Sequence, residues 1–314
     1  MSRLSVTAIV PNYNHAHYVR NAIRSLLDQS HTPDELIVID DGSTDDSLAV
    51  IERVCGGASN VRILRNPENR GVIYTLNRGL DEARGDYVLF GAADDRYCPG
   101  LFAASLAALQ RHPDAGLSCG NLVTLDSASE KHKRVSMPFG DNEVGFSADG
   151  TVALMRRSNF LFFSGTVLLR RDAALAAGGL IPELRWHADW FLNFVVAFRH
   201  GFCFVPEDVM VKRVGDSTYS AQRRDWRKQR NVIRAVVCRL YDPDYADVLP
   251  RFRSGAVLPT LQLAALPLLL GEPLLRRYVT PLLAWRLALY SMLQTIGAGV
   301  PAGVKRSLRR LIRI

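Results

Sequence analysis

The sequence lacks the signals that assign a protein to several common functional classes. Its 314 residues include only five cysteines, and no two of them form a C-x-x-C pair. We therefore expect reduced thiols in a cytosolic protein, rather than a disulfide framework or a zinc site. No G-x-x-x-x-G-K-[ST] phosphate loop occurs, and no predicted strand is followed by G-x-G-x-x-G. A phosphate-bearing ligand would therefore be held mainly by side chains and a cation.

The N-terminus opens directly into the strand-like run LSVTAIVP, so we expect no secretory signal. The composition, 48% hydrophobic and 22% charged, is typical of a globular protein, and the length allows one large domain or a domain with an appendage.

Charge is distributed unevenly along the sequence. Residues 223–314 carry 17 Lys and Arg against 5 Asp and Glu, a net +12, whereas residues 1–222 carry a net −4. The basic segment 223–314 predicts contact with an anionic surface.

Short apolar runs alternate with amphipathic segments through the first hundred residues. The expected strands are residues 4–10, 35–40, 61–66 and 86–92, and the expected helices are residues 17–29, 47–55 and 71–84. Apolar strands separated by helices predict an α/β fold with a mostly parallel sheet flanked by helices. Further strands are expected at 116–126, 164–171 and 202–214, with a polar loop at 127–142 and a strong helix after His187. From about residue 216 onward the pattern is helical.

Polar clusters follow each of the first four expected strands. They read PNYN, DDGSTDD, RNPENRG and AADDRY in chain order. Ligands of parallel α/β sheets bind at the carboxyl ends of the strands, which is where these clusters lie. Asp41 could accept a hydrogen bond from a nucleotide base or a ribose hydroxyl, with Asn12 and Tyr13 beside it. The plainer alternative is that these residues cap the next helix and form turns.

The fourth cluster contains two adjacent acids, Asp94 and Asp95, directly after the strand-like run VLFGA. Adjacent carboxylates repel each other unless a positive charge lies near them. Mg²⁺ is usually held by one or two carboxylates together with substrate phosphates, and it would neutralise a diphosphate leaving group. A solvated turn is the alternative interpretation of the pair.

A third acid, Asp189, stands within the stretch WHADWF at the beginning of an apolar helix. The helix dipole alone would favour an acid there, and His187 alone is more often a structural residue than a ligand. An acid between aromatic side chains and beside a diphosphate site is also suited to be a general base.

Together these clusters resemble the family 2 glycosyltransferases, which have the GT-A fold. The resemblance is carried by IVPNYNHAHYVRNAIRSLLDQSHTPDELIVIDDGSTDDS, NPENRGVIYTLNRGL, ARGDYVLFGAADD and GTVLLRRDAALAAGGLIPELRWHADWFL, and it covers roughly residues 3–215. It implies a glycosyltransferase domain over residues 1–215, with a nucleotide-sugar half (about 1–100) and an acceptor half (about 101–215). Residues 216–314 then form a helical, basic C-terminal region.

The resemblance implies a role for each matching residue. Those implied to bind the nucleotide sugar are Pro11, Asn12, Tyr13, Asp40, Asp41, Asn69, Gly71, Asn77 and Asp94. Asp94 and Asp95 are implied to hold Mg²⁺ or Mn²⁺, and Asp189 to deprotonate the acceptor hydroxyl in an inverting transfer. Those implied on the acceptor or phosphate side are Trp186, His187, Trp190 and Arg213.

Three positions depart from the family pattern. Ala92 stands where the family commonly has a further acid, and Ala188 stands where it often has Glu before the catalytic Asp. Arg213 is followed by Val214 rather than by the second basic position of an Arg-x-His motif. The site therefore has fewer possible metal ligands than the family pattern provides.

The expected reaction transfers a sugar from a UDP-, GDP- or dTDP-linked donor to a glycan or a lipid-linked acceptor in cell-surface polysaccharide synthesis. A nucleotidyltransferase and a non-catalytic sugar-nucleotide-binding or scaffold protein of the same fold are the alternatives. The leucine-rich run 254–271 is interrupted by Pro259 and Pro267, and the terminal GVKRSLRRLIRI is strongly basic. We expect peripheral attachment to the inner face of the plasma membrane, or a basic helix packed on the domain. No basic–aromatic platform suggests a nucleic-acid partner.

Overall fold

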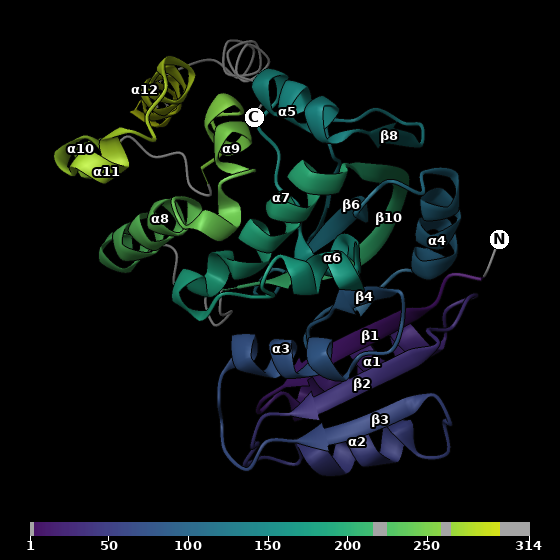
Figure 1. Ribbon diagram of the computed structural model, residues 1–314. Coiled ribbons are helices and arrows are strands. Elements are labelled where there is room, and N and C mark those ends of the chain that lie inside the picture. The colour runs from purple at the N-terminus through teal and green to yellow at the C-terminus, as the bar shows by residue number, and fades with distance from the viewer. Residues whose placement is uncertain (1–2, 216–224, 259–264, 296–314) are drawn as a thin grey trace.

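A computed structural model describes residues 3–215, 225–258 and 265–295 of the chain (Figure 1). Its strands are β1 (Val6–Asn12), β2 (Glu35–Asp40), β3 (Val61–Arg65), β4 (Tyr87–Phe90), β5 (Arg96–Tyr97), β6 (Leu117–Asp126), β7 (His132–Val135), β8 (Val144–Phe146), β9 (Val167–Arg170) and β10 (Phe202–Val214). The basic terminal stretch after residue 295 lies outside the described residues.

Helices separate most of these strands. The α-helices are α1 (Ala16–Leu27), α2 (Ser47–Cys55), α3 (Val72–Glu82), α4 (Leu101–Arg111), α5 (Ala148–Arg157), α6 (Arg171–Ala176), α7 (Ala188–His200), α8 (Trp226–Leu240), α9 (Leu249–Ser254), α10 (Ala265–Gly271), α11 (Pro273–Arg276) and α12 (Pro281–Thr295). The 3₁₀ turns are η1 (Ser164–Thr166), η2 (Pro182–His187) and η4 (Pro243–Tyr245).

The strands form one mixed, mostly parallel sheet in the order β3-β2-β1-β4-β9-β6-β10-β5. The first four strands in this order run parallel to one another, which confirms the α/β expectation. β9 runs antiparallel to both β4 and β6, and β10 is again parallel to β6. The antiparallel β9 therefore separates the parallel strands β3, β2, β1 and β4 from β6, β10 and β5.

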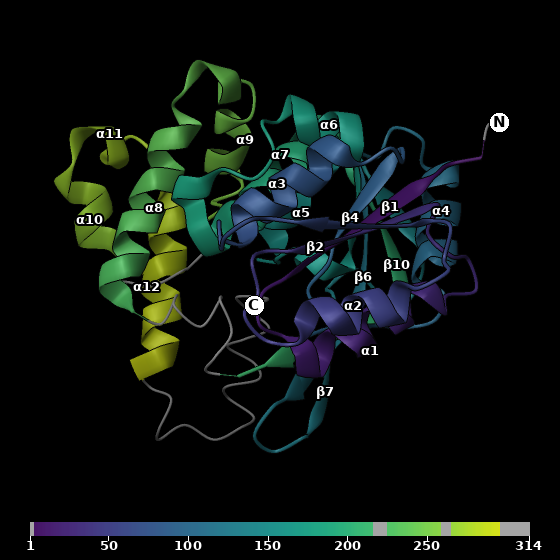
Figure 2. The same ribbon diagram turned by 90° about the horizontal axis from the view of Figure 1, so that it is seen from below.

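Both faces of the sheet are covered, which explains the unbroken apolar runs of its central strands. On β1, Ala8 and Val10 pack with the apolar faces of α1 and α2, whereas Ile9 packs with α3 and the α7 side of the molecule. Successive side chains of a strand point to opposite faces, so a strand buried on both faces is apolar at every position. Figure 2 shows α1 and α2 on one side of the sheet and α3 on the other.

The C-terminal helices belong to the same hydrophobic core as α7. The ring of Phe191 lies 5.1 Å from that of Tyr245 and 5.8 Å from that of Phe252, measured between centroids. Arg286 of α12 is 2% exposed and donates to the backbone carbonyls of Gly255 (2.8 Å) and Met155. Its charge, which interrupts an apolar run of the sequence, is therefore buried against the domain. Among the described residues, no helix is long and apolar enough to cross a bilayer.

The structure corrects one expectation of the sequence and excludes one further role. The polar segment 127–142 is not simply a loop, because it contains β7, which pairs antiparallel with β6. The stretch Gly116–Gly120 has the G-x-S-x-G letters of a nucleophile elbow, but Ser118 is fully buried. A catalytic serine of that type is exposed at a strand-to-helix turn, so Ser118 does not have this role.

Candidate functional site

The carboxyl ends of β1, β2, β3 and β4 meet at one edge of the sheet, as parallel pairing requires. Asn12 lies opposite Asp40, and Asp40 lies opposite Arg65. The backbone N–H of Gly91, just after β4, donates to the carbonyl of Ile9 at 2.8 Å. The four polar clusters of the sequence are therefore brought to the same edge.

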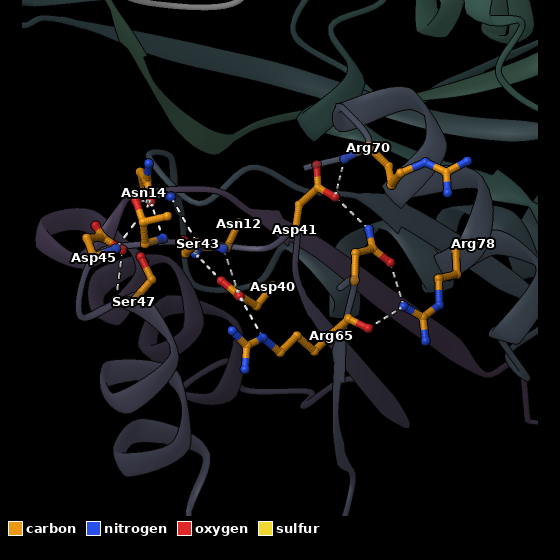
Figure 3. Close-up of polar contacts among 12 residues, drawn as sticks. Asn12, Asn14, Asp40, Asp41, Ser43, Asp45, Ser47, Arg65, Arg70 and Arg78 are labelled. Atoms are coloured by element: carbon orange, nitrogen blue, oxygen red, sulfur yellow. Dashed lines mark hydrogen bonds and ion pairs between the residues drawn. The ribbon is translucent and has the colours of Figure 1, made fainter. Parts of the chain in front are cut away.

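Asp40 is fully buried and joins β1, β2 and the following loop. Its Oδ1 accepts from Asn12 Nδ2 (3.2 Å) and its Oδ2 accepts from the backbone N–H of Ser43 (3.1 Å) (Figure 3). Arg65 Nε lies 3.9 Å from the same Oδ2 and is close enough for an ion pair. The first acid of DDGSTDD therefore holds the strand ends together from inside the protein.

Asp41 is also buried and organises the loop after β3. Its Oδ1 accepts from Asn66 Nδ2 (2.6 Å) and from the backbone N–H of Arg70 (3.0 Å), and its Oδ2 accepts from that of Gly71 (2.9 Å). Figure 3 shows Asp41 directed toward Arg70 and away from the Asp40 cluster. In the free protein, Asp41 fixes the backbone that would border a nucleotide, and its contact with a base or ribose stays a prediction.

The other residues expected near the nucleotide are placed differently from one another. Tyr13 is 40% exposed, Pro11 is half-buried, and Asn69 is exposed while its Oδ1 accepts from the N–H of Gly71. Asn77 exchanges two hydrogen bonds with the backbone of Leu180, at 2.7 and 2.9 Å, which attaches α3 to the segment that leads into η2.

A pocket next to this edge brings the two halves of the chain together. From the first hundred residues it is lined by Asp94, Asp95 and the neighbouring Ala92, and from the later part of the chain by Asp189 and Arg213. Arg185, Trp186 and Lys212 also line it, as do two phenylalanines, Phe90 and Phe163. Asp94, Asp95 and Asp189 therefore share one cavity, although Asp95 and Asp189 are 94 positions apart in the sequence.

The acid pair is held by a short strand pairing. After the pair, β5 runs antiparallel to β10 with Arg96 opposite Val211. This register allows Asp95 Oδ1 to accept from the backbone N–H of Arg213 at 2.8 Å. Asp95 is 6% exposed, and its burial, followed by repulsion from Asp94, raises its pKa to about 7. Asp95 is buried and the adjacent Asp94 is half-buried, and their negative charges are only partly compensated, so the two carboxylates are poised to accept a cation.

Asp189 stands at the first turn of α7, where its Oδ1 accepts from the backbone N–H of Trp190 at 2.8 Å. Burial raises the pKa of Asp189 above its ordinary value, and the positive charge of Lys212 opposes that rise. The described residues supply no hydrogen bond to its second oxygen. A carboxylate with a raised pKa and a free oxygen on a pocket wall fits the requirements of a general base.

Lys212 and Arg185 belong to the pocket although the sequence analysis did not select them. Lys212 lies in the β10 run FCFVPEDVMVKRV, which has no recognisable motif, so only the pairing of β10 with β5 reveals its place. Arg185 precedes WHADWF and has a backbone φ of 47° and ψ of −124°. A positive φ is unusual for a residue other than glycine, and it is the only signal that marks Arg185.

The aromatic residues around Asp189 divide into pocket wall and core. Trp186 lines the pocket, and its Nε1 donates to Gln229 Oε1 of α8 at 2.7 Å. His187 is buried, with Nε2 2.9 Å from Gln229 Nε2. Trp190 is buried against Phe194 and Phe252 in the core and does not line the pocket. The acceptor-side roles implied for these three residues stay predictions.

The residues of the pocket are compatible with a divalent cation that is shared with a substrate. No cluster of three or more His, Cys, Asp or Glu side chains able to hold a metal occurs in the described part of the chain. Asp94 and Asp95 supply carboxylate oxygens for one or two positions, and Mg²⁺ typically completes its shell with water and substrate phosphates. The donor set therefore fits an ion brought together with a diphosphate, and not an all-protein cage.

Comparisons with known proteins agree with this geometry. Residues 7–176 match the family described as Glycosyl transferase family 2. A Bacillus subtilis protein, TuaG, provisionally named as a teichuronic acid biosynthesis glycosyltransferase, is 34% identical over 92 residues, covering 29% of this chain and 36% of that protein. The structure of S. aureus TarS 1–349 with UDP-GlcNAc covers 98% of this chain and 79% of its own, with 16% identity and a TM-score of 0.60.

A mannosyltransferase from Pyrobaculum calidifontis, solved with GDP-Man and Mn²⁺, is similar over all of this chain and 86% of its own, with 17% identity and a TM-score of 0.56. At these identities the two structures establish the GT-A fold and not the substrate. The family match covers more than half of the chain and includes both the nucleotide-side clusters and the acid pair. The chain therefore belongs to glycosyltransferase family 2, a family of enzymes that transfer sugars from activated donors.

Proposed function

We propose that this glycosyltransferase catalyses inverting transfer of a sugar from a nucleoside diphosphate donor to a hydroxyl group, by a single displacement in the pocket described above. The observation that carries the proposal is that Asp94, Asp95 and Asp189 line the same cavity. An acid pair suited to hold a cation together with the donor diphosphate, and a carboxylate with a raised pKa, are the two features that such a displacement needs.

Asp189 is proposed as the general base. Its Oδ1 is held by the N–H of Trp190, which fixes the carboxylate at the helix terminus and leaves the second oxygen for the acceptor hydroxyl. An unactivated hydroxyl is a poor nucleophile, and a positioned base contributes roughly 10²–10⁴-fold to the rate. The alanine at position 188 is 2% exposed and adds no second acid, so Asp189 acts alone.

Asp94 and Asp95 are proposed to hold Mg²⁺ or Mn²⁺ together with the donor. When bound, the ion would neutralise the charge that develops on the leaving nucleoside diphosphate. The N–H of Arg213 keeps Asp95 in place for this purpose. The relative solved with GDP-Man and Mn²⁺ supports a metal for this fold.

The donor is proposed to be UDP-, GDP- or dTDP-linked. The structural relatives were solved with UDP-GlcNAc and with GDP-Man, which supports a nucleoside diphosphate sugar but leaves the base open. The loop that Asp41 fixes, together with Pro11, Tyr13 and Asn69, is proposed to border the nucleoside.

The acceptor is proposed to be a glycan or a lipid-linked glycan of a cell-surface polysaccharide, which the name of the relative TuaG supports. Access to a lipid-linked acceptor would be aided by peripheral membrane contact. The C-terminal helices present exposed apolar side chains at Leu270, Leu274 and Trp285, with exposed Arg276 and Arg277 nearby in sequence. Apolar and basic side chains together favour an anionic bilayer surface.

The variant Asp189→Asn tests the proposal. We expect transfer of the sugar, measured to acceptor or to water, to fall by at least 10²-fold, because the amide cannot take up the hydroxyl proton. Affinity for the nucleoside diphosphate, measured by calorimetry, should change less than about threefold, because Asp189 is not among the residues proposed to bind the nucleotide.

Asp172→Asn is the matched control. Asp172 also accepts, through Oδ1, from the backbone N–H of the next residue (2.6 Å) in the first turn of a helix, but it is exposed. Its variant should transfer sugar at the wild-type rate. Unchanged turnover in Asp189→Asn would show that another group is the base. Lack of turnover in the wild-type protein with every donor, despite donor binding, would favour the non-catalytic alternative.

A further inference from the structure

The pocket contains a lysine that is close to three carboxylates but is paired with none of them. Lys212 lines the cavity together with Asp94, Asp95 and Asp189. In the described part of the chain no ion pair within 4.0 Å involves its Nζ. The centroid of the Phe163 ring lies 6.0 Å from Nζ, at the limit of a cation–π contact.

The fold fixes Lys212 beside the acid loop. β10 pairs with β5 through Val211 opposite Arg96, and the next hydrogen bond joins the N–H of Arg213 to Asp95. Lys212 lies between these two anchored positions, so its backbone cannot shift along the strand. Side chains alternate along a strand, and Arg213 lies against Tyr18 (4.6 Å from Cζ to the ring centroid), whereas Lys212 lies on the side of Phe163. The positive charge opposes the raised pKa of both Asp95 and Asp189.

The charges of the pocket wall explain what this lysine can bind. The pocket is lined by three acids (Asp94, Asp95 and Asp189) and three basic residues (Arg185, Lys212 and Arg213), and the guanidinium of Arg213 lies against Tyr18. The acid pair alone would repel a diphosphate, and the positive charge of Lys212 reduces that repulsion. A lysine ammonium binds phosphate as a compact charge with three hydrogen-bond donors. An ammonium that is not in an ion pair breaks no existing ion pair when it binds the phosphate.

We propose that Lys212 binds the diphosphate of the nucleotide-sugar donor directly, so that this chain keeps a substantial part of its donor affinity without a divalent cation. The inference rests on the proposed function. It also accounts for a site in which Ala92 stands at the position of a further acid, because a smaller carboxylate set is combined with a protein cation beside the acid pair.

The experiment measures affinity for UDP, GDP and dTDP by calorimetry, in EDTA and in saturating Mn²⁺, and continues with the tightest binder and its free nucleoside. For Lys212→Met we expect the affinity for the nucleoside diphosphate in EDTA to fall about 10- to 100-fold, the usual effect of losing a charged hydrogen-bond partner. Affinity for the free nucleoside should be unchanged. Lys212→Arg, which keeps the charge, should restore most of the lost affinity.

Arg84→Met is the charge-matched control, because Arg84 precedes β4 and lies at the opposite end of the strands from the pocket. It should bind like the wild type, and thermal unfolding of each variant verifies that the fold is retained. Equal affinity of Lys212→Met and wild type in EDTA would overturn the inference alone, as would an equal loss for nucleoside and diphosphate. Failure of the wild type to bind any of the three nucleotides, with or without Mn²⁺, would overturn the proposed function as well.

Discussion

Asp189 is a half-buried carboxylate on the pocket wall, and the proposed reaction requires its ionised form, so the activity of the enzyme should depend on pH. Burial raises its pKa above the ordinary aspartate value of 3.8, with Lys212 opposing the rise. The base is active when deprotonated, so activity is lost as pH falls through this raised pKa. We expect the acidic limb of the kcat profile, measured at saturating donor and metal, to lie above pH 3.8.

The same argument predicts the effect of Lys212→Met on that limb. Removing the opposing cation raises the pKa of Asp189 further, so the acidic limb should move to higher pH, whereas Arg84→Met should leave it in place. An identical limb in the wild type and in Lys212→Met would contradict the assignment of Asp189 as the titrating group.

At the scale of single residues, the sequence predicted the acids of the site better than its cations. Asp94, Asp95 and Asp189 stand at strand or helix ends, and such positions are visible in the apolar pattern. Lys212 lies inside a strand, and which strand it meets depends on the pairing of β5 with β10, which no local pattern encodes. The hydrogen bonds of Asp41 to Arg70 and Gly71 were likewise beyond prediction, because they join two loops that are 29 and 30 residues apart.

At the scale of elements, the 3₁₀ turn η2 stores backbone strain beside the pocket. Arg185 has φ 47° and ψ −124°, a conformation that glycine adopts without a steric penalty. Such a residue costs about 1–3 kcal/mol, and strain of this kind is concentrated at functional sites. Arg185 lines the pocket and precedes Trp186, which also lines it.

The pair of variants Arg185→Gly and Arg185→Ala separates the strain from the side chain. Both lose the guanidinium, and both should transfer sugar more slowly than the wild type. Only the glycine variant relieves the backbone, so its free energy of unfolding in denaturant should exceed that of the alanine variant by about 1 kcal/mol. An alanine variant as stable as the glycine variant would show that η2 is unstrained.

The elements themselves were predictable where the apolar run was continuous. Glu35–Asp40 and Ser47–Cys55 form the strand and the helix that their patterns indicate, with the same boundaries. β7 was missed because HKRV has no apolar face and is exposed or half-buried along its length. The antiparallel direction of β9 could not be inferred either, since a buried strand has the same pattern in both directions.

At the scale of the whole molecule, the C-terminal helices cover part of the hydrophobic core and also expose apolar side chains on the surface. Deleting residues 216–314 would uncover Phe191 and other core residues of α7, so truncation would test folding rather than attachment. Substitutions of exposed residues are the better test of membrane attachment. We expect Arg276→Glu combined with Arg277→Glu to weaken sedimentation of the full chain with vesicles of anionic lipid, because each basic residue near such a surface contributes about 1 kcal/mol.

Charge reversal at two positions should therefore reduce the vesicle-bound fraction strongly in low salt and have little effect with zwitterionic vesicles. The control reverses two exposed arginines near the other end of the chain, Arg53 and Arg84, and should bind like the wild type. Equal binding of both double variants to anionic vesicles would show that the face of α11 does not meet the membrane.

The hydrogen bond between Trp186 and Gln229 connects the pocket to the C-terminal helices. It links Trp186 on the pocket wall to α8, and α8 packs against α10 and α11, which carry exposed apolar and basic side chains. The indole of Trp186, which borders the cavity, is thus connected through Gln229 and α8 to the outer helices α10 and α11. An enzyme built in this way would hold its cavity at a set height and tilt above any surface on which those helices rest.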